Sequence, residues 1–291
     1  MSNLKDALKK NKFPVTSEIG PPKGINVDHE LESAVQLKDK VTAVNVTDLQ
    51  SAVMRVGSLA MCRLLQELGV EPVLQVTCRD RNRISLQSEL LSAAVLGIDN
   101  VLCLTGDHIV LGDHKETKTV YDLDSVQLLR AVGDLNSGHD MAGHELDGTP
   151  NLFSGAVVTP EFDPLEPQLI KMKKKIDAGA KFFQTQAVFD AEKFKAFMDR
   201  LTQWNVPIMA GIVLLKSAGM AKFMNENVAG IFVPDDLIDQ MKKTSKEDRK
   251  KKAAEIAAHT IRQVRPYCQG IHIMPLGWDD VVVEIIEQAE L

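Results

Sequence analysis

The stretch Phe13-Pro14-Val15-Thr16-Ser17-Glu18-Ile19-Gly20-Pro21-Pro22 decides how the rest of the chain is interpreted. Its first half alternates apolar and small polar residues, which favours a strand, and Gly20-Pro21-Pro22 ends the sheet ladder because proline has no backbone donor. Glu18 therefore lies at the carboxyl end of a predicted strand. In a parallel α/β barrel that end carries the active site, and a carboxylate held there can act as a proton donor.

Short apolar runs like this one recur along the chain. They cover residues 13–19, 41–47, 72–77, 100–105, 153–159, 180–186, 206–213 and 270–275. Several are almost continuous in Val, Ile, Leu and Phe, as expected of strands that are covered on both faces. The runs therefore predict the strands of a buried parallel sheet.

Helical patterns with apolar spacing near 3.6 separate the runs. They cover residues 28–39, 51–68, 83–96, 124–136, 164–178, 190–203 and 279–289. Helix starts are predicted at Asp28, Ser51, Asp124 and Asp190, which are N-cap residue types. Left-handed helix ends are predicted at Gly69, Gly97 and Gly179.

Strands alternating with helices predict an α/β fold, a single (β/α)₈ barrel of the TIM type that forms one catalytic domain over residues 1–291. A doubly wound open sheet is the alternative, but its Gly-x-Gly-x-x-Gly turn is missing. A helical insertion is expected before the last strand, at residues 226–264. Pro234 opens its first helix, and Thr244 and Glu247 are placed as a capping box for the second.

The composition excludes several classes of protein. A net charge of −6 argues against a nucleic acid or an anionic membrane as the partner. No apolar run is long enough to span a membrane, and the N-terminus lacks the apolar stretch of a signal peptide, so a cytoplasmic location is expected.

Metal chemistry is not predicted. The cysteines, Cys62, Cys78, Cys103 and Cys268, form no Cys-x-x-Cys pair and are interpreted as reduced thiols. The histidines of the loops do not have the His-x-x-x-His spacing that places two ligands on one helix face.

Polar side chains gather where the predicted strands end. They are Glu18, Thr47-Asp48, Thr77-Cys78-Arg79-Asp80, Thr105-Gly106-Asp107, Thr159-Pro160-Glu161, Gln184-Thr185-Gln186 and Lys216-Ser217. Because an unpaired buried polar group costs about 1 to 3 kcal/mol, such a set needs water or a ligand. The sequence therefore predicts a polar ligand pocket at the carboxyl ends of the strands.

Most of these strand ends belong to short motifs that follow one another in a fixed order along the chain. The motifs are Ser17-Glu18-Ile19-Gly20-Pro21-Pro22, Val46-Thr47, Val76-Thr77-Cys78, Leu104-Thr105-Gly106-Asp107, Thr159-Pro160-Glu161, Lys175-Ile176-Asp177-Ala178-Gly179-Ala180 and Gln184-Thr185-Gln186. In this order and spacing the chain resembles the methylenetetrahydrofolate reductase family over about residues 13–276. Its length is similar to that of the short bacterial members, which consist of the catalytic barrel alone.

The resemblance implies a flavin-dependent enzyme that reduces 5,10-methylenetetrahydrofolate to 5-methyltetrahydrofolate. By the same resemblance Glu18 is the general acid that opens the folate ring to an iminium, Asp107 lies between flavin and folate, and Gln186 contacts the folate. Residues at the implied cofactor site are Thr47, Gln75, Thr105, Asp107, Val157, Thr159 and Lys175.

Several positions depart from the family pattern. Ile19-Gly20 replaces two aromatic residues that many members have after the glutamate. Gln75 and Thr105 stand where a histidine and an arginine are common, Thr159 where a tyrosine is common, and Ala218 roughly where a phenylalanine is common. The family implies FAD and NAD(P)H. The departures lead to the hypothesis that FMN replaces FAD and that a partner iron–sulfur protein supplies electrons, in an oligomer or complex.

Two other functions are compatible with the same barrel. A pterin-binding methyltransferase barrel would move the methyl group without a flavin. A non-catalytic barrel subunit of a redox complex would explain the altered cofactor positions.

Overall fold

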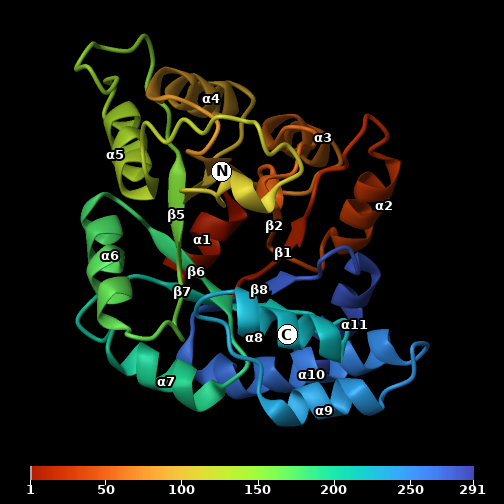
Figure 1. Cartoon of the computed structure of the whole chain (residues 1–291). Coiled ribbons are helices and arrows are strands. Elements are labelled where there is room, and N and C mark those ends of the chain that lie inside the picture. Colours follow the sequence, from red (N-terminus) through yellow and green to blue (C-terminus); the bar gives the residue numbers. More distant parts are fainter. Residues whose placement is uncertain (1) are drawn as a thin grey trace.

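The strands form a closed parallel barrel in chain order in the computed structural model, which describes residues 2–291 (Figure 1). They are β1 (Val15–Ile19), β2 (Ala43–Val46), β3 (Pro72–Thr77), β4 (Asn100–Leu104), β5 (Phe153–Val158), β6 (Phe182–Ala187), β7 (Ile208–Val213) and β8 (Gly270–Met274). Pairing of β8 with β1 closes the ring. The predicted (β/α)₈ barrel is confirmed and the open-sheet alternative is wrong.

Helices surround the barrel (Figure 1). They are α1 (Asn3–Lys9), α2 (Asp28–Leu37), α3 (Ser58–Glu67), α4 (Arg83–Val95), α5 (Ser125–Asn136), α6 (Glu166–Asp177), α7 (Ala191–Asp199), α8 (Ala218–Asn227), α9 (Asp235–Lys243), α10 (Arg249–Val264) and α11 (Val282–Gln288). Short 3₁₀ turns add η1 (Gln50–Ala52), η2 (Ile109–Leu111), η3 (Arg265–Tyr267) and η4 (Asp279–Val281). The helical insertion before the last strand is therefore present as α9 and α10.

Several predicted helix ends are confirmed. Asp124 caps α5 through bonds from the backbone of Val126 and Gln127, and Asp190 caps α7 in the same way. Left-handed φ angles of +77°, +78° and +106° occur at Gly69, Gly97 and Gly179. These positions need no tertiary information, because the capping residue and the glycine act within one turn of the chain.

The predicted helix over residues 51–68 is wrong in its first part. Ser51 lies in η1 with a φ of +56°, and α3 begins only at Ser58, after the extended N-cap Gly57. Leu49 and Ala52 also have positive φ. The segment takes this shape because it folds over the end of the barrel instead of along its side. Asp28 is the first residue of α2, one position after the N-cap.

The predicted capping box at the second insertion helix is also wrong. The hydroxyl of Thr244 donates back to the carbonyl of Gln240, so Thr244 ends α9. Ser245 instead accepts from the backbone of Asp248 before α10. Helices α1, which is short, and α8, whose second residue is the weak helix former Gly219, were not predicted from the sequence.

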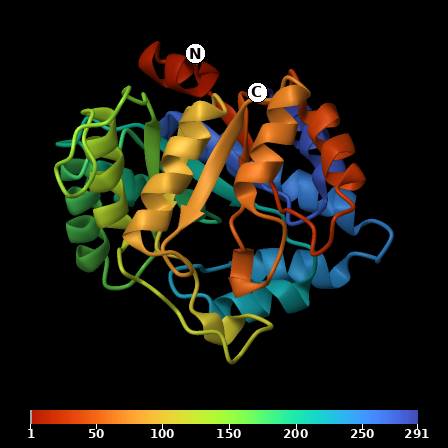
Figure 2. The ribbon, with the colours of Figure 1, turned by 90° about the horizontal axis from the view of Figure 1, so that it is seen from above.

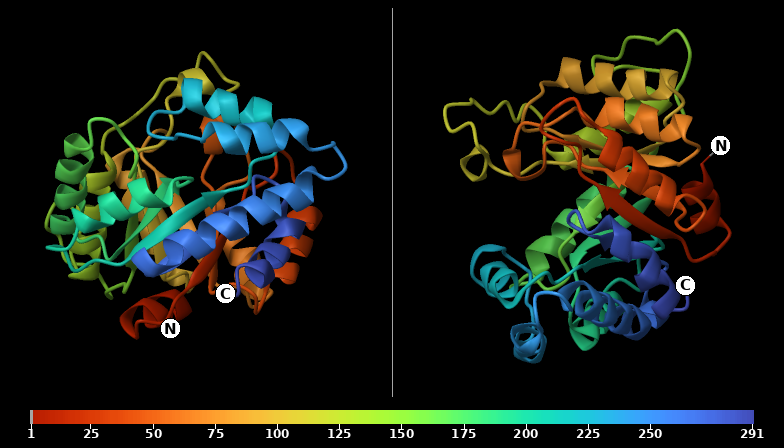
Figure 3. Two further views of the ribbon diagram at one scale, coloured as in Figure 1. Left: turned by 90° about the horizontal axis from the view of Figure 1, so that it is seen from below. Right: turned by 90° about the vertical axis from the view of Figure 1, so that its right-hand side faces the viewer.

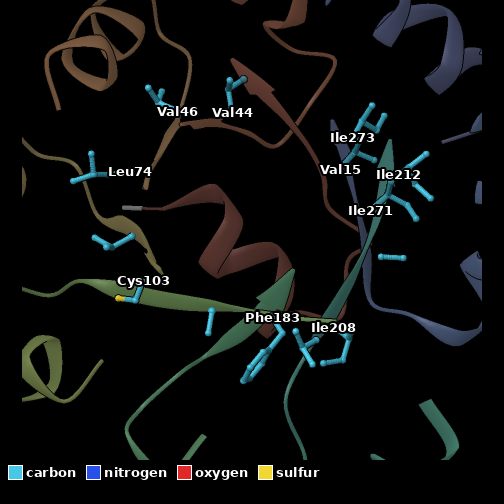
Figure 4. Close-up of a cluster of buried hydrophobic side chains, with 14 of the residues drawn as sticks. Val15, Val44, Val46, Leu74, Cys103, Phe183, Ile208, Ile212, Ile271 and Ile273 are labelled. Atoms are coloured by element: carbon cyan, nitrogen blue, oxygen red, sulfur yellow. The ribbon is translucent and has the colours of Figure 1, made fainter. Parts of the chain in front are cut away.

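The main core fills the space between the barrel and its helices. Figure 4 shows side chains such as Val44, Leu74, Ile271 and Ile273 on the strands, and each is fully buried. Strands covered in this way must be apolar on their outer face. Burial of that face fixes the strand register and so fixes which side chains point into the barrel.

The amino end of the barrel is closed by α1. Leu4 and Leu8 pack against a lower interior layer that includes Phe153 and Phe182, whose rings stack 5.2 Å apart. Glu71 accepts from the backbone of Leu4 at 3.0 Å and so caps the first turn. Figure 2 shows α1 at one end of the barrel and the segment that follows β4 at the other. Helix α1 therefore covers the amino end of the barrel interior.

Candidate active site at the carboxyl ends of the strands

A cavity of about 390 Å³ opens at the carboxyl ends of the strands. Every residue that the sequence placed in the catalytic, substrate or cofactor site lines it: Glu18, Thr47, Gln75, Thr105, Asp107, Val157, Thr159, Lys175 and Gln186. Figure 3 shows the segment after β4 and helix α8 projecting on the side of the barrel away from the N-terminus. The predicted polar pocket is therefore present, although Asp80, Glu161, Lys216 and Ser217 of the predicted strand-end set do not line it.

Glu18 points into this cavity from the end of β1. Its side chain is 10% exposed. The Nε2 amide of Gln75 on β3 donates to Glu18 Oε2 at 3.2 Å. His272 on β8 places its Nε2 3.8 Å from the same oxygen. Both partners approach Oε2, and Glu18 Oε1 forms no hydrogen bond to the residues at 2–291.

A buried polar layer supports this carboxylate from below. Thr16 Oγ1 lies 3.0 Å from His272 Nδ1 and accepts from Gln184 Nε2 at 3.2 Å. The amides of Gln184 and Asn45 bond to each other at 2.7 and 3.1 Å. Because every member has a partner, the layer holds the His272 ring in one orientation.

Sequence reasoning missed His272 and Asn45. A signal was available, because each is a polar residue within an apolar strand run, at a position whose neighbours point outward. What the sequence could not give is the distance across the barrel that joins β1, β2, β6 and β8.

Asp107 lies at the rim of the cavity and is exposed. Its Oδ2 accepts from the backbone of Ser51 in η1 at 3.0 Å. The buried guanidinium of Arg79 donates to the carbonyls of Asp107 and Leu49, each at 3.2 Å. Arg79 thus holds the turn after β2 against the turn after β4. The two predicted carboxylates share one cavity but have different surroundings, Glu18 in the barrel and Asp107 at its edge.

A second buried ion pair supports the same wall. Asp48 is fully buried in its side chain and accepts from Arg81 at 2.6 and 3.1 Å. It also accepts from the backbone and the hydroxyl of Thr77. The pair fixes the ends of β2 and β3 next to the cavity, so it acts on the shape of the site.

The implied flavin site combines an unpartnered hydroxyl with a cationic end. Thr47 lines the cavity, and its buried Oγ1 has no hydrogen-bond partner among residues 2–291. At the α6 wall, Lys175 donates to the carbonyl of Val157 at 2.7 Å. Burial, together with the nearby charge of Lys171, lowers the pKa of Lys175 to about 8. A buried amine with a neighbouring cation is stabilised by an anion such as a phosphate.

The hydroxyl of Thr105 forms hydrogen bonds within the fold. Its Oγ1 accepts from the backbone of Ser125 and bonds to the Ser125 hydroxyl, each at 3.2 Å. These contacts join the end of β4 to the start of α5, so its hydroxyl is already engaged within the fold.

The cysteines are buried thiols. Burial raises the pKa of Cys78 to about 12, which leaves no thiolate near neutral pH. Cys103 lines the cavity with its thiol protonated for the same reason. Among residues 2–291 no cluster of His, Cys, Asp and Glu is arranged to hold a metal ion. In the same part of the chain, no helix combines the length and apolarity that a membrane crossing requires.

Comparison with known families decides what this barrel is. The family model for methylenetetrahydrofolate reductase matches residues 3–290. The chain belongs to the methylenetetrahydrofolate reductase family. The resemblance seen in the sequence motifs is therefore confirmed, and the family match covers the cavity and every strand that forms it.

Individual relatives agree with this membership. A Pectobacterium carotovorum protein named 5,10-methylenetetrahydrofolate reductase is 28% identical over 73% of this chain and 70% of its own length. Methylenetetrahydrofolate reductase 2 of Schizosaccharomyces pombe is 26% identical over 80% of this chain but only 38% of its own length. The match to the yeast relative therefore spans well under half of that protein.

The barrel is also similar to solved structures. A Clostridium thermocellum protein described as binding two copies of 5-methyl-5,6,7,8-tetrahydrofolic acid aligns over 100% of both chains, with a TM-score of 0.64 and 17% identity. A 2,3-dimethylmalate lyase aligns with a TM-score of 0.53 at 12% identity. At these identities the likeness concerns the barrel fold.

Proposed function

We propose that this chain reduces 5,10-methylenetetrahydrofolate to 5-methyltetrahydrofolate with a bound flavin. Family membership over residues 3–290 supports the reaction. The observation that carries the mechanism is Glu18, a mostly buried carboxylate inside the barrel mouth with Gln186 and Thr47 on the same cavity wall.

Glu18 is the proton donor in this proposal. Its Oε1 is the oxygen that faces no protein donor, so the proton is held there and moves to a ring nitrogen of the folate. Protonation makes that nitrogen a leaving group, the carbon–nitrogen bond breaks, and an iminium is left on the substrate. The exposed carboxylate of Asp107 at the rim then offers a negative charge to the cationic folate.

Gln186 orients the folate from the end of β6 in this proposal. Thr47 and Lys175 would hold the flavin, Thr47 by its unpartnered hydroxyl and Lys175 by its charge next to a phosphate. Gln75, Thr105, Val157 and Thr159 complete the implied cofactor wall. When bound, the flavin would supply the hydride that reduces the iminium.

The identity of the flavin and of its electron donor forms the finer part of the proposal. The departures at Gln75, Thr105 and Thr159 favour FMN and a partner iron–sulfur protein over FAD and NAD(P)H. Mass measurement of the extracted cofactor tests the first point. Rapid oxidation of NADH by the purified protein with bound FAD would contradict both. Oligomeric state, a cytoplasmic location and the single-domain organisation of residues 1–291 stay predictions.

The central experiment is Glu18→Gln. We expect flavin binding and flavin reduction to survive, while folate turnover falls by roughly 10² or more, the scale of general-acid catalysis. Equal loss of both half-reactions would instead make Glu18 a structural residue. A protein that binds folate but no flavin would favour the methyltransferase alternative, and stoichiometric copurification with a redox partner without flavin reduction by any donor would favour the non-catalytic subunit.

A further inference from the structure

The proposed acid has partners on only one of its two oxygens. Gln75 Nε2 donates to Glu18 Oε2 at 3.2 Å, and His272 Nε2 lies 3.8 Å from that same oxygen. A carboxylic acid carries its proton on one oxygen and accepts hydrogen bonds best on the other. The arrangement therefore distinguishes the two oxygens before any ligand binds.

We infer that Gln75, assisted by His272, is a positioning residue that keeps the proton of Glu18 on Oε1, the oxygen available to the substrate. The inference rests on the proposed function, since it concerns how the acid of that reaction is presented. As the proton leaves, negative charge develops on the carboxylate, and the Gln75 amide already points at it. A donor placed in advance in this way stabilises the transition state without reorganisation.

The orientation of Gln75 follows from its place in the barrel. The residue is 7% exposed, and its side chain projects inward from β3, with the alternation that also points Val73 and Thr77 inward. An unpaired buried amide is unfavourable, and Glu18 Oε2 is its hydrogen-bond acceptor. Gln75 therefore contacts the acid in this chain, at a position where a histidine is common in the family.

His272 approaches the same oxygen, Glu18 Oε2, from β8. Its ring is held at Nδ1 by Thr16, which is fixed in turn by Gln184. A separation of 3.8 Å is too long for a hydrogen bond, but catalytic contacts often shorten when substrate closes the site. The other charged groups around the cavity are Asp48, Arg79, Asp107, Lys171 and Lys175, and none forms an ion pair with Glu18 in the described chain.

The test is Gln75→Met, which keeps the length of the side chain and removes the donor. In the flavin-loaded protein, we follow reoxidation of reduced flavin by 5,10-methylenetetrahydrofolate against pH. We expect the maximal rate to fall about tenfold, the effect of one hydrogen bond to a developing charge. The alkaline limb of the pH profile should move upward, because the carboxylate has lost a donor that favours its charged form. Folate affinity should change less than threefold.

Controls separate positioning from general damage. Gln75→His keeps a donor and should recover the rate to within about threefold. Gln66→Met removes a comparable amide on the outer surface, where it bonds to the carbonyl of Gly97, and should leave the rate and the profile unchanged. If Gln75→Met does not fold, Gln75→Asn withdraws the same donor by one methylene and should give the same two shifts.

The result that overturns the inference is specific. Positioning by Gln75 is refuted if Gln75→Met changes neither the maximal rate nor the alkaline limb of the pH profile. If Glu18→Gln has lost folate turnover in the same experiment, the proposed function stays intact. If Glu18→Gln itself keeps its folate turnover, the proposed function fails. His272→Leu is a second test, since it should shift the alkaline limb of the pH profile in the same direction as Gln75→Met.

Discussion

Replacement of Lys175 by methionine should stabilise the protein and lower its affinity for a flavin. Lys175 is 8% exposed as a residue, and burial with the nearby charge of Lys171 lowers the pKa of its amine from 10.5 to about 8. Each pKa unit is worth about 1.4 kcal/mol, so carrying this charge destabilises the folded state by about 3 kcal/mol at neutral pH. Lys175→Met removes that penalty and loses the hydrogen bond to Val157, worth about 1 kcal/mol.

The net expectation at pH 7 is a gain of about 2 kcal/mol in the free energy of unfolding. For 291 residues the melting entropy is about 0.6 kcal/mol per kelvin, so the melting temperature should rise by about 3 °C. The pH dependence has a definite sign. Between pH 8 and 10.5 the unfolded lysine binds a proton that the folded lysine does not, so the native protein gains stability with rising pH relative to Lys175→Met.

Urea unfolding of both proteins without flavin, at pH 7 and pH 10, measures the difference. The advantage of Lys175→Met should be largest at pH 7 and should shrink as the pH rises. Flavin affinity should fall at least tenfold in the variant, because the cation opposite the phosphate is lost. Lys173→Met, on the exposed outer side of α6, serves as the matched control. A variant that is less stable than the native protein at pH 7, with no pH-dependent difference, would refute the reasoning.

Three other changes test residues outside the cavity lining. Arg81→Met leaves the buried Asp48 without its counter-ion and should lower the free energy of unfolding by about 3 kcal/mol, measured by urea titration; the double change with Asp48→Asn should recover part of the loss. Gly112→Ala would place a Cβ 1.9 Å from the carbonyl oxygen of Ala52, so η1 and η2 should separate. Amide hydrogen exchange over residues 109–120 should then accelerate, while exchange in the strands should not change. Burial raises the pKa of Glu161 from 4.5 to about 7. The free energy of unfolding of the native protein should therefore fall by roughly 2 kcal/mol between pH 5 and 8, and that of Glu161→Gln should not. Equal pH dependence of the free energy of unfolding in the two proteins would contradict this.

The strands and most helices could be predicted from the sequence because their signals are local. A short, mostly apolar run such as residues 100–105 favours a covered strand because its length and the turn residues that flank it argue against a helix. Asp124 and Asp190 mark helix starts through bonds to backbone groups two and three positions away. The segment at residues 50–57 could not be predicted in this way, because its left-handed residues are imposed by contact with the turn after β4.

Glu18 and the other polar strand ends were identified by the sequence because barrel topology brings all carboxyl ends to one face, whatever the distances are. Thr47, Lys175 and Gln186 needed the family resemblance as well, since nothing local distinguishes them from ordinary strand-end or helix residues. Their place on one cavity is a geometric fact that the structure adds.

By itself, the sequence determined the barrel, its polar mouth and the glutamate at the end of the first strand, because periodicity and chain order are sufficient for these. Only the tertiary structure decided which residues contact that glutamate. Gln75 and His272 come from strands far apart in the chain, and they reach one oxygen of Glu18 because closure of the ring places β3 and β8 on either side of β1. Hydrogen bonds depend on distances below 3.5 Å, and such distances are set by packing across the barrel and not by spacing along the chain.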